Sequence, residues 1–241
     1  MEFTLGLIVF ILLMIYVVYR FLKNSHTLTG VKSAQEMQEI AASSLDTSEN
    51  NVSNNFTYSI WIYVQNWNYR YGEPKVIFGR MVKGDGMGEP CPSITLAPIE
   101  NNAIISLSVY PGLDEKPPHG ENHIIHNTVI QDVPVQKWVN LAISVYNRTL
   151  DIYLDGKLTK TELLPGIAKV DGSAPVYVTP KGGFAGWTAN MKYWSNASNP
   201  EQIWDIYKSG YSNSWFGDLL NQFGIKISFV DGGVEKSSIT I

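Results

Sequence analysis

The acidic side chains that could act in catalysis do not form a pair suited to acid–base chemistry. Asp114 and Glu115 are neighbours on a loop rich in proline and glycine, while Asp151 and Asp155 flank Tyr153 in an apolar-alternating segment. Glycoside hydrolysis, for example, needs two carboxyl groups roughly 5 to 10 Å apart. Neither pair has a further acidic partner at the right spacing, so we interpret all four residues as solvated and predict no catalytic residue.

Three histidines gather in one stretch and raise the question of a metal site. His119, His123 and His126 occur with Glu121 among them. Zinc requires three or four ligands that converge in a fixed geometry. On a strand His123 and His126 would point to opposite faces, and His119 follows two prolines in a loop. We therefore favour exposed or singly hydrogen-bonded histidines.

A glycine-rich stretch, KGDGMGEPCP, offers two more acidic residues. Asp85 and Glu89 could supply oxygen ligands to calcium from a loop. Calcium favours six to eight oxygen ligands, however, and too few acids cluster here to provide them. The sequence predicts no metal ion and no cofactor.

Aromatic side chains in the polar loop QNWNYRYGEPK are the best candidates for contact with a partner. Trp67, Tyr69 and Tyr71 alternate with polar residues there. Aromatic rings outside a core can stack on sugar rings or anchor a protein interface. Alternatively, the loop folds over a sheet edge and buries two of the three rings. We predict contact with a protein or a glycan.

Two consecutive strands form the framework that must position these loops. In residues 138–158, WVNLAISVYNRTLDIYLDGKL, apolar side chains alternate in two runs that residues 147–149 join. This period-two pattern is typical of half-buried strands. The dipeptide Asp155-Gly156 then begins a further turn, because it tolerates positive φ at both positions. The segment predicts an antiparallel meander.

Short strands recur along the rest of the chain. Residues 56–64 alternate Phe56, Tyr58 and Ile60 with Trp61 and other bulky residues, which predicts a strand covered on both faces. Further strands are expected at residues 76–82, 94–96, 104–110, 123–130, 176–179 and 187–194. Such spacing, punctuated by glycine, proline and asparagine, indicates an all-β antiparallel sandwich or jelly roll.

Three of these segments carry a family resemblance. The hairpin at 138–158, the strand FTYSIWIYV at 56–64 and GFAGWTANMKYWSNASNPEQIWDIYKSG at 183–210 occur in one order. In that order they resemble laminin-G-like jelly rolls of the concanavalin A-like lectin/glucanase superfamily. The resemblance covers residues 55–210 and implies a jelly-roll fold. Glucanases of the superfamily carry an alternating acidic run, Glu-x-Asp-x-x-Glu-like, which this chain lacks.

The N-terminus has the composition of a membrane anchor. No charge occurs between Phe3 and Tyr19, and Arg20 and Lys23 follow. About 20 apolar residues span a bilayer, so residues 3–22 predict one transmembrane helix, and residues 1–23 the anchor. A signal peptide is the alternative, but a basic start and a small-residue cleavage site are missing. Basic residues after the span place the domain on the cytoplasmic side.

Small polar residues dominate from residue 24 to 54, which we interpret as a linker. Apolar residues at near-helical spacing predict a short amphipathic helix over 31–45. The linker is either a spacer that holds the domain off the bilayer or a flexible tether.

Two features close the chain. Asn199, Pro200 and Gln202 are typical of a helix start, and Gly210 is placed to end that helix. In the extension 211–241, apolar residues at 216, 219, 220 and 223 predict a second short helix, and a terminal hairpin around residues 231–233 follows.

Composition narrows the class of protein. The chain of 241 residues has 44% hydrophobic and 17% charged residues and a net charge of -4. The absence of a basic stripe argues against nucleic-acid binding. A single cysteine, Cys91, favours a reducing compartment. Sequons at Asn51, Asn55, Asn147 and Asn196 weakly favour secretion, but chance matches explain them in so polar a chain.

These observations favour a non-catalytic, membrane-anchored interaction module. Chains consisting of an anchor, a linker and a laminin-G-like jelly roll also resemble minor capsid or virion proteins of large double-stranded DNA viruses. That resemblance implies a position between an internal membrane and the capsid, with capsid proteins as partners. A carbohydrate-binding lectin is the alternative, and a glucanase is the least favoured.

Overall fold

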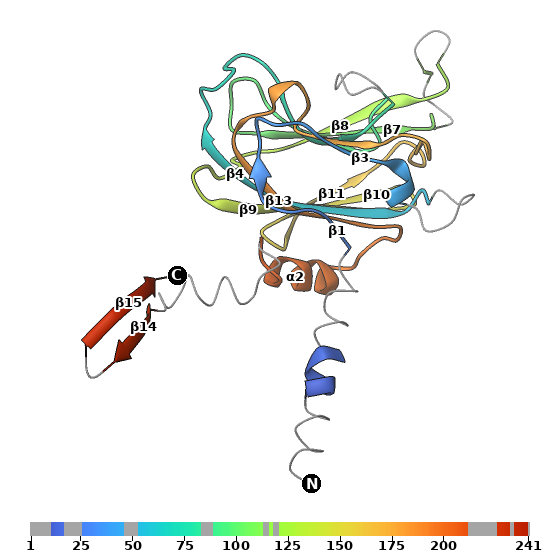
Figure 1. Ribbon diagram of the computed structural model, residues 1–241. Helices are drawn as coiled ribbons and strands as arrows, with labels where there is room; N and C mark the ends of the chain where they lie inside the picture. Colours follow the sequence, from blue (N-terminus) through green and yellow to red (C-terminus); the bar gives the residue numbers. More distant parts are fainter. Residues whose placement is uncertain are drawn as a thin grey trace.

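Two antiparallel sheets packed face to face make up most of the protein (Figure 1). The computed structural model describes residues 11–16, 26–45, 53–82, 89–112, 116–117, 121–211, 226–231 and 234–240. The predicted all-β sandwich is confirmed. Alternation of apolar side chains gives each strand one face toward the space between the sheets, and burial of these faces holds the layers together.

The seven-stranded sheet has the order β1-β13-β4-β9-β10-β11, and β2 also pairs with β13. Its strands are β1 (Thr27–Thr29), β2 (Lys32–Ser33), β4 (Phe56–Asn66), β9 (Trp138–Tyr146), β10 (Thr149–Leu154), β11 (Lys157–Leu163) and β13 (Ala185–Trp194). The strand β4 is buried along most of its length on both faces, as its bulky residues predict.

The six-stranded sheet has the order β3-β12-β5-β6-β7-β8. Its strands are β3 (Gln38–Ile40), β5 (Lys75–Arg80), β6 (Ser93–Leu96), β7 (Ala103–Val109), β8 (Ile124–Ile130) and β12 (Val176–Val178). Each predicted strand is present with an end shifted by a few residues at most. One core fills the space between the sheets, with Ile60, Ile105 and Ile143 among its fully buried side chains.

The predicted meander is confirmed as β9, β10 and β11. Thr149 pairs with Tyr146 across a tight turn in which Asn147 has a φ of 52°. At the second turn Asp155 and Gly156 both have positive φ, at 49° and 73°. The turn residues therefore set the register, as the sequence suggests.

The amphipathic helix predicted over residues 31–45 is wrong. Residues 26–45, which we call the N-terminal strap, form β1, β2, β3 and a single 3-10 turn, η1 (Ala42–Ser44). The strap pairs with β13 at the edge of one sheet and with β12 at the edge of the other. Strand edges offer unpaired N–H and C=O groups, and pairing with them competes successfully with a short isolated helix.

The predicted helix start near the C-terminus is confirmed. Asn199 caps α2 (Pro200–Lys208) by accepting from the Gln202 N–H, and the Gln202 side chain accepts from the Asn199 N–H, both at 2.9 Å. Gly210 has a φ of 77° and ends the helix. In Figure 1, α2 covers the face of the seven-stranded sheet that points away from the six-stranded sheet.

The predicted terminal hairpin is also confirmed. The strands β14 (Lys226–Asp231) and β15 (Val234–Thr240) pair with each other in an antiparallel arrangement. The helix predicted at residues 216–223 lies outside the described residues.

Most of the predicted membrane span at residues 3–22, including Arg20, lies outside the described residues, as does Lys23. Residues 11–16 of the span are described, and they are helical. Within the described ranges, no helix combines the length and apolar character needed to cross a membrane.

Candidate functional site

The loop that is predicted to contact a partner carries three aromatic rings, of which one is exposed and two are partly covered. Tyr71 is 59% exposed. Trp67 packs against the core, and Tyr69 is half-buried beside Gly182. The loop thus folds over the end of the sandwich and leaves the Tyr71 ring exposed.

Trp67 has a local structural partner in Lys75. The Lys75 side chain is buried, and its Nζ atom lies 5.2 Å from the centre of the Trp67 ring. Burial lowers the pKa of Lys75, since the charged ammonium loses its hydration. The cation–π contact offsets part of this loss. Trp67 therefore stabilises the buried Lys75 side chain, which gives this ring a structural role.

Both acidic residues of the central meander have structural partners. Asp155 accepts from the Asn140 N–H at 2.9 Å and from Lys137 Nζ at 3.2 Å. Asp151 accepts from Thr161 Oγ1 at 2.6 Å. These contacts close a turn and join neighbouring strands. Both side chains are half-buried, so the prediction that they are simply solvated is wrong. Asp114 and Glu115 lie outside the described residues.

Two of the three predicted histidines, His123 and His126, lie within the described residues, and their rings do not converge. His123 is buried, with its Nδ1 atom 3.4 Å from Lys169 Nζ, and Lys169 donates to Glu89 at 2.7 Å. The His126 ring lies elsewhere, with Nε2 3.9 Å from Glu162. Among the described residues, no group of three acidic, histidine or cysteine side chains could hold a metal ion. His119 and Asp85 lie outside these residues.

An aromatic row crosses the outer face of the seven-stranded sheet. Trp187 on β13, Tyr63 on β4 and Trp138 on β9 are directly registered neighbours. The Tyr63 ring lies 5.5 Å from the Trp187 ring and 5.7 Å from the Trp138 ring, both edge-on. Aromatic pairs across strands stabilise a sheet beyond their buried area. The row is also a surface, because Trp187 is 39% exposed.

The helix α2 and the residues after it extend this row. Tyr211 stacks on Trp138 at 4.5 Å and contacts Trp61 at 6.1 Å. Tyr207 stacks on Trp61 at 5.5 Å and meets Trp204 at 5.3 Å. Seven rings therefore form one continuous chain, which we call the aromatic face: Trp187, Tyr63, Trp138, Tyr211, Trp61, Tyr207 and Trp204.

One buried side chain fixes α2 on the sheet. Ile203 is fully buried against Ala142 and Tyr153, with Ile206 packed at the side. The Tyr153 side chain is itself buried, which raises its pKa to about 12, because the phenolate would lose its hydration. Gly156 lies under the helix, where a Cβ atom would stand 2.8 Å from Tyr207 Cβ. The turn thus needs glycine for its φ and for this close approach.

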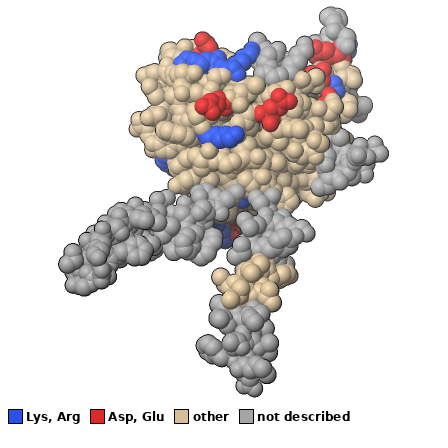
Figure 2. Space-filling view, viewed as in Figure 1, with Lys and Arg blue, Asp and Glu red and all other residues tan. Residues whose placement is uncertain are grey.

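On the side shown in Figure 2, acidic and basic side chains are scattered over a mostly uncharged surface. Two ion pairs lie near the aromatic face: Lys208 contacts Asp205 at 2.8 Å, and Lys137 contacts Asp155 at 3.2 Å.

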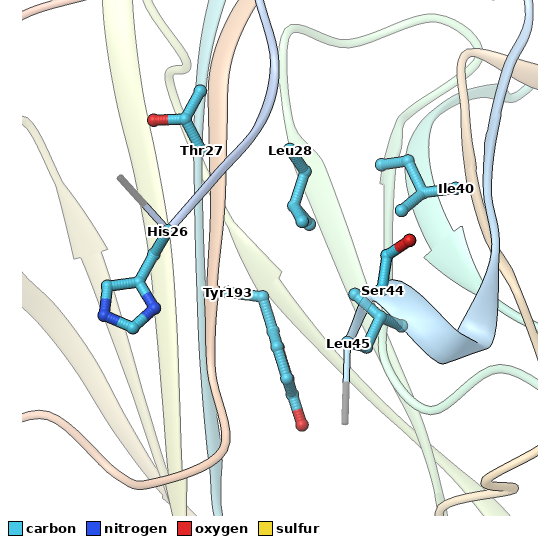
Figure 3. A pocket seen from close by; sticks show the side chains of 7 residues that line it. All are labelled: His26, Thr27, Leu28, Ile40, Ser44, Leu45 and Tyr193. Atoms are coloured by element: carbon cyan, nitrogen blue, oxygen red, sulfur yellow. The ribbon is translucent and has the colours of Figure 1, made fainter. Parts of the chain in front are cut away.

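A cavity of about 420 Å³ lies where the N-terminal strap bridges the two sheets (Figure 3). Leu28, Ile40 and Leu45 provide apolar walls, and Tyr193 lies across it. His26 lies at one side, with its ring 5.3 Å from Trp194. Besides the His26 imidazole, the lining includes the hydroxyl-bearing side chains of Thr27, Ser44 and Tyr193. Among the described residues, no acidic or basic one other than His26 lines the cavity, and we ascribe it to packing of the strap.

The bulky residues of 56–64 predicted a covered second face for that strand, but the sequence did not predict the aromatic face as a whole. Trp61, Tyr63, Trp138 and Trp187 occupy the strand positions that alternate with core residues. These positions are normally polar on an exposed sheet face, so bulky aromatic residues there indicate a second covered or contacting surface. Which rings meet depends on strand order, which alternation alone does not give.

Two stacked antiparallel sheets with this order and surface define a jelly-roll domain. The chain belongs to the concanavalin A-like lectin/glucanases superfamily, since the family model of that description matches residues 39–204. The resemblance found in the sequence is thereby confirmed at the level of the family. No curated protein matches the chain.

Solved structures similar to this chain include binding domains that are much longer than it. An HCR/D mutant is 13% identical, with a TM-score of 0.52, over 76% of this chain and 43% of that one. The botulinum neurotoxin serotype G binding domain is 13% identical, with a TM-score of 0.49, over 80% and 47%. The chain thus spans less than half the length of these structures, and its likeness to the HCR/D mutant concerns the fold alone.

Proposed function

We propose that this protein is a non-catalytic interaction module held on a membrane by its N-terminal segment. In this proposal it is a minor capsid component that links an internal virion membrane to capsid proteins, with the domain on the cytoplasmic side. The resemblance of anchor, linker and jelly roll to virion proteins supports the viral setting. Arg20 and Lys23, which follow the apolar stretch, support the orientation.

One observation carries the membrane part of the proposal. Residues 11–16 are helical, and each of their six side chains is between 47% and 60% exposed. All six are apolar or aromatic, and they belong to the uncharged stretch between Phe3 and Tyr19. An apolar helical surface of this kind is stable when lipid covers it.

A single charge within this helix tests the anchor. Leu12→Arg is expected to disfavour insertion by about 2.5 to 3.5 kcal/mol, because arginine near the centre of a span is costly. The measurement is the fraction of full-length protein that remains with membranes after alkaline extraction. Leu12→Ala serves as the control and is expected to stay in the membrane fraction. Retention of Leu12→Arg at the same level would contradict the anchor.

Carbohydrate binding is the second candidate function, and the exposed ring of Tyr71 favours it. This ring stands at the end of the sandwich, where it could stack on a sugar. A glycan array probed with the full-length protein is the test: if the module is a lectin, Tyr71→Ala is expected to abolish a specific signal. Trp67→Ala is less suitable, because it also uncovers Lys75. An array without specific signal removes the lectin candidate.

A further inference from the structure

The distance between the proposed anchor and the folded domain is short. The predicted span ends at Leu22, while Thr27 already pairs with Lys192 in the seven-stranded sheet. Five residues cover at most about 18 Å when fully extended. The strap is therefore part of the sandwich, and it leaves too little chain for a spacer that would hold the domain well away from the bilayer.

The strap begins next to the aromatic face. Thr27 Oγ1 donates to Asn190 Oδ1 at 3.1 Å, and Asn190 Nδ2 donates to the Gly210 carbonyl oxygen at 2.7 Å. Lys192 Nζ also lies 3.0 Å from Ser209 Oγ. The start of the domain and the end of α2 thus meet on the same side of the sheet, one residue before Tyr211 joins the stack.

The composition of this side suits a lipid headgroup layer. Tryptophan and tyrosine prefer the boundary between hydrocarbon and water, because their rings are apolar and their N–H or O–H groups remain hydrated. Trp187 and Trp204 are the most exposed rings of the face, each 39% exposed. Two ion pairs near the face, Lys137 with Asp155 and Lys208 with Asp205, add no net charge, and Lys192 contacts the Ser209 hydroxyl. A zwitterionic headgroup layer suits such a surface.

We propose that the aromatic face rests on the headgroup layer of the membrane that holds the N-terminal helix. The inference rests on the proposed membrane anchor and adds an orientation: the seven-stranded sheet faces the lipid, and the outer face of the six-stranded sheet points away. The proposed capsid partner would then meet the six-stranded sheet or the loops at the ends of the sandwich.

Site-specific fluorescent probes on the full-length protein in phosphatidylcholine vesicles can test this orientation. Cys91 is the only cysteine, it is buried, and burial raises the pKa of its thiol to about 12, so introduced cysteines can be labelled selectively. Probes are placed by Lys208→Cys on α2, Val31→Cys at the strap edge and Asn127→Cys on β8. All three positions are exposed. Quenching by lipids that carry a nitroxide on the headgroup is the readout.

Strong quenching at position 208 with background quenching at position 127 is expected. Replacing Trp187 and Trp204 together by serine is expected to abolish the quenching at 208. The matched control, Ile125→Ser with Val129→Ser, removes two exposed side chains from the six-stranded sheet and is expected to leave it unchanged. Strongest quenching at 31 would mean that the domain stands on its edge, and strongest quenching at 127 that it is inverted; either result overturns the proposal.

Flotation with the vesicles separates this inference from the anchor itself. If the protein does not float with vesicles, the proposed membrane function fails and the orientation fails with it. If it floats but the probe at 208 stays unquenched, the orientation alone is wrong. Burial of the 208 probe by a second copy of the chain, seen as concentration-dependent protection without lipid quenching, also overturns it.

Discussion

Gly186→Ala is expected to lower the free energy of unfolding of the domain by about 2 to 6 kcal/mol, the sum of overpacking and backbone strain. Gly186 lies in β13 with a φ of 154°, and an added Cβ atom would overlap the carbonyl oxygen of Tyr63. That oxygen belongs to the backbone of β4, so no side-chain rotation can relieve the overlap. The two central strands would have to separate.

The same substitution is expected to loosen the strap. The Gly186 carbonyl oxygen accepts from the Ala34 N–H at 2.9 Å, and Ala34 is fully buried. Displacement of β13 would strain this bond and shift Trp187, the residue that follows. Chemical denaturation measures the loss of stability, and hydrogen exchange at Ala34 reports whether the strap opens first.

Gly72→Ala is the matched control for this prediction. Gly72 also has a positive φ, 85°, but nothing lies within 4 Å of the position of its missing Cβ atom. Its substitution therefore carries backbone strain alone, about 1 to 3 kcal/mol. An equal loss of stability in the two variants would contradict the close approach of Gly186 to Tyr63.

Ile203→Ala is expected to release α2 from the sheet and to cost about 2 to 5 kcal/mol, as removal of a fully buried isoleucine commonly does. Ile203 is the only buried residue of α2, and its contacts are Ala142, Tyr153 and Ile206. Alanine itself favours the helical conformation, so α2 should still form. The lost free energy is that of packing α2 against the seven-stranded sheet.

The consequence for the aromatic face is specific. Without Ile203 the rings of Tyr207 and Tyr211 lose their support and no longer cover Trp61, which is only 6% exposed in the intact domain. Hydrogen exchange along α2 and quenching of tryptophan fluorescence by an aqueous quencher should both rise. Ile125→Ala on β8 removes the same atoms from an exposed position and is expected to change neither. If α2 keeps its protection in Ile203→Ala, other contacts hold the helix.

Local patterns in the sequence predicted the strands and turns well, because each depends on neighbours along the chain. The alternation of apolar and polar side chains in residues 138–158 predicted the meander, and Asp155-Gly156 predicted its second turn. The capping residues Asn199 and Gln202 likewise predicted where α2 begins. Each signal reflects a local backbone preference, which the fold retains.

The N-terminal strap shows where such reasoning fails. Residues 31–45 match helical spacing, yet they pair with β13 and β12. Those strands follow the strap by more than a hundred residues. Local sequence patterns around residues 31–45 therefore cannot predict that the strap pairs with them. Tertiary pairing outweighed a weak helical preference.

The fold class, the family and the amphipathic character of each strand follow from the sequence alone, since periodicity and turn chemistry are properties of short segments. The three-dimensional fold was needed to show that Trp187, Tyr63 and Trp138 form one row, that α2 extends this row, and that Thr27 is linked to Gly210 through Asn190. These contacts join residues far apart in the chain. Their physical cause is strand order and register, which arise when two sheets bury one shared core.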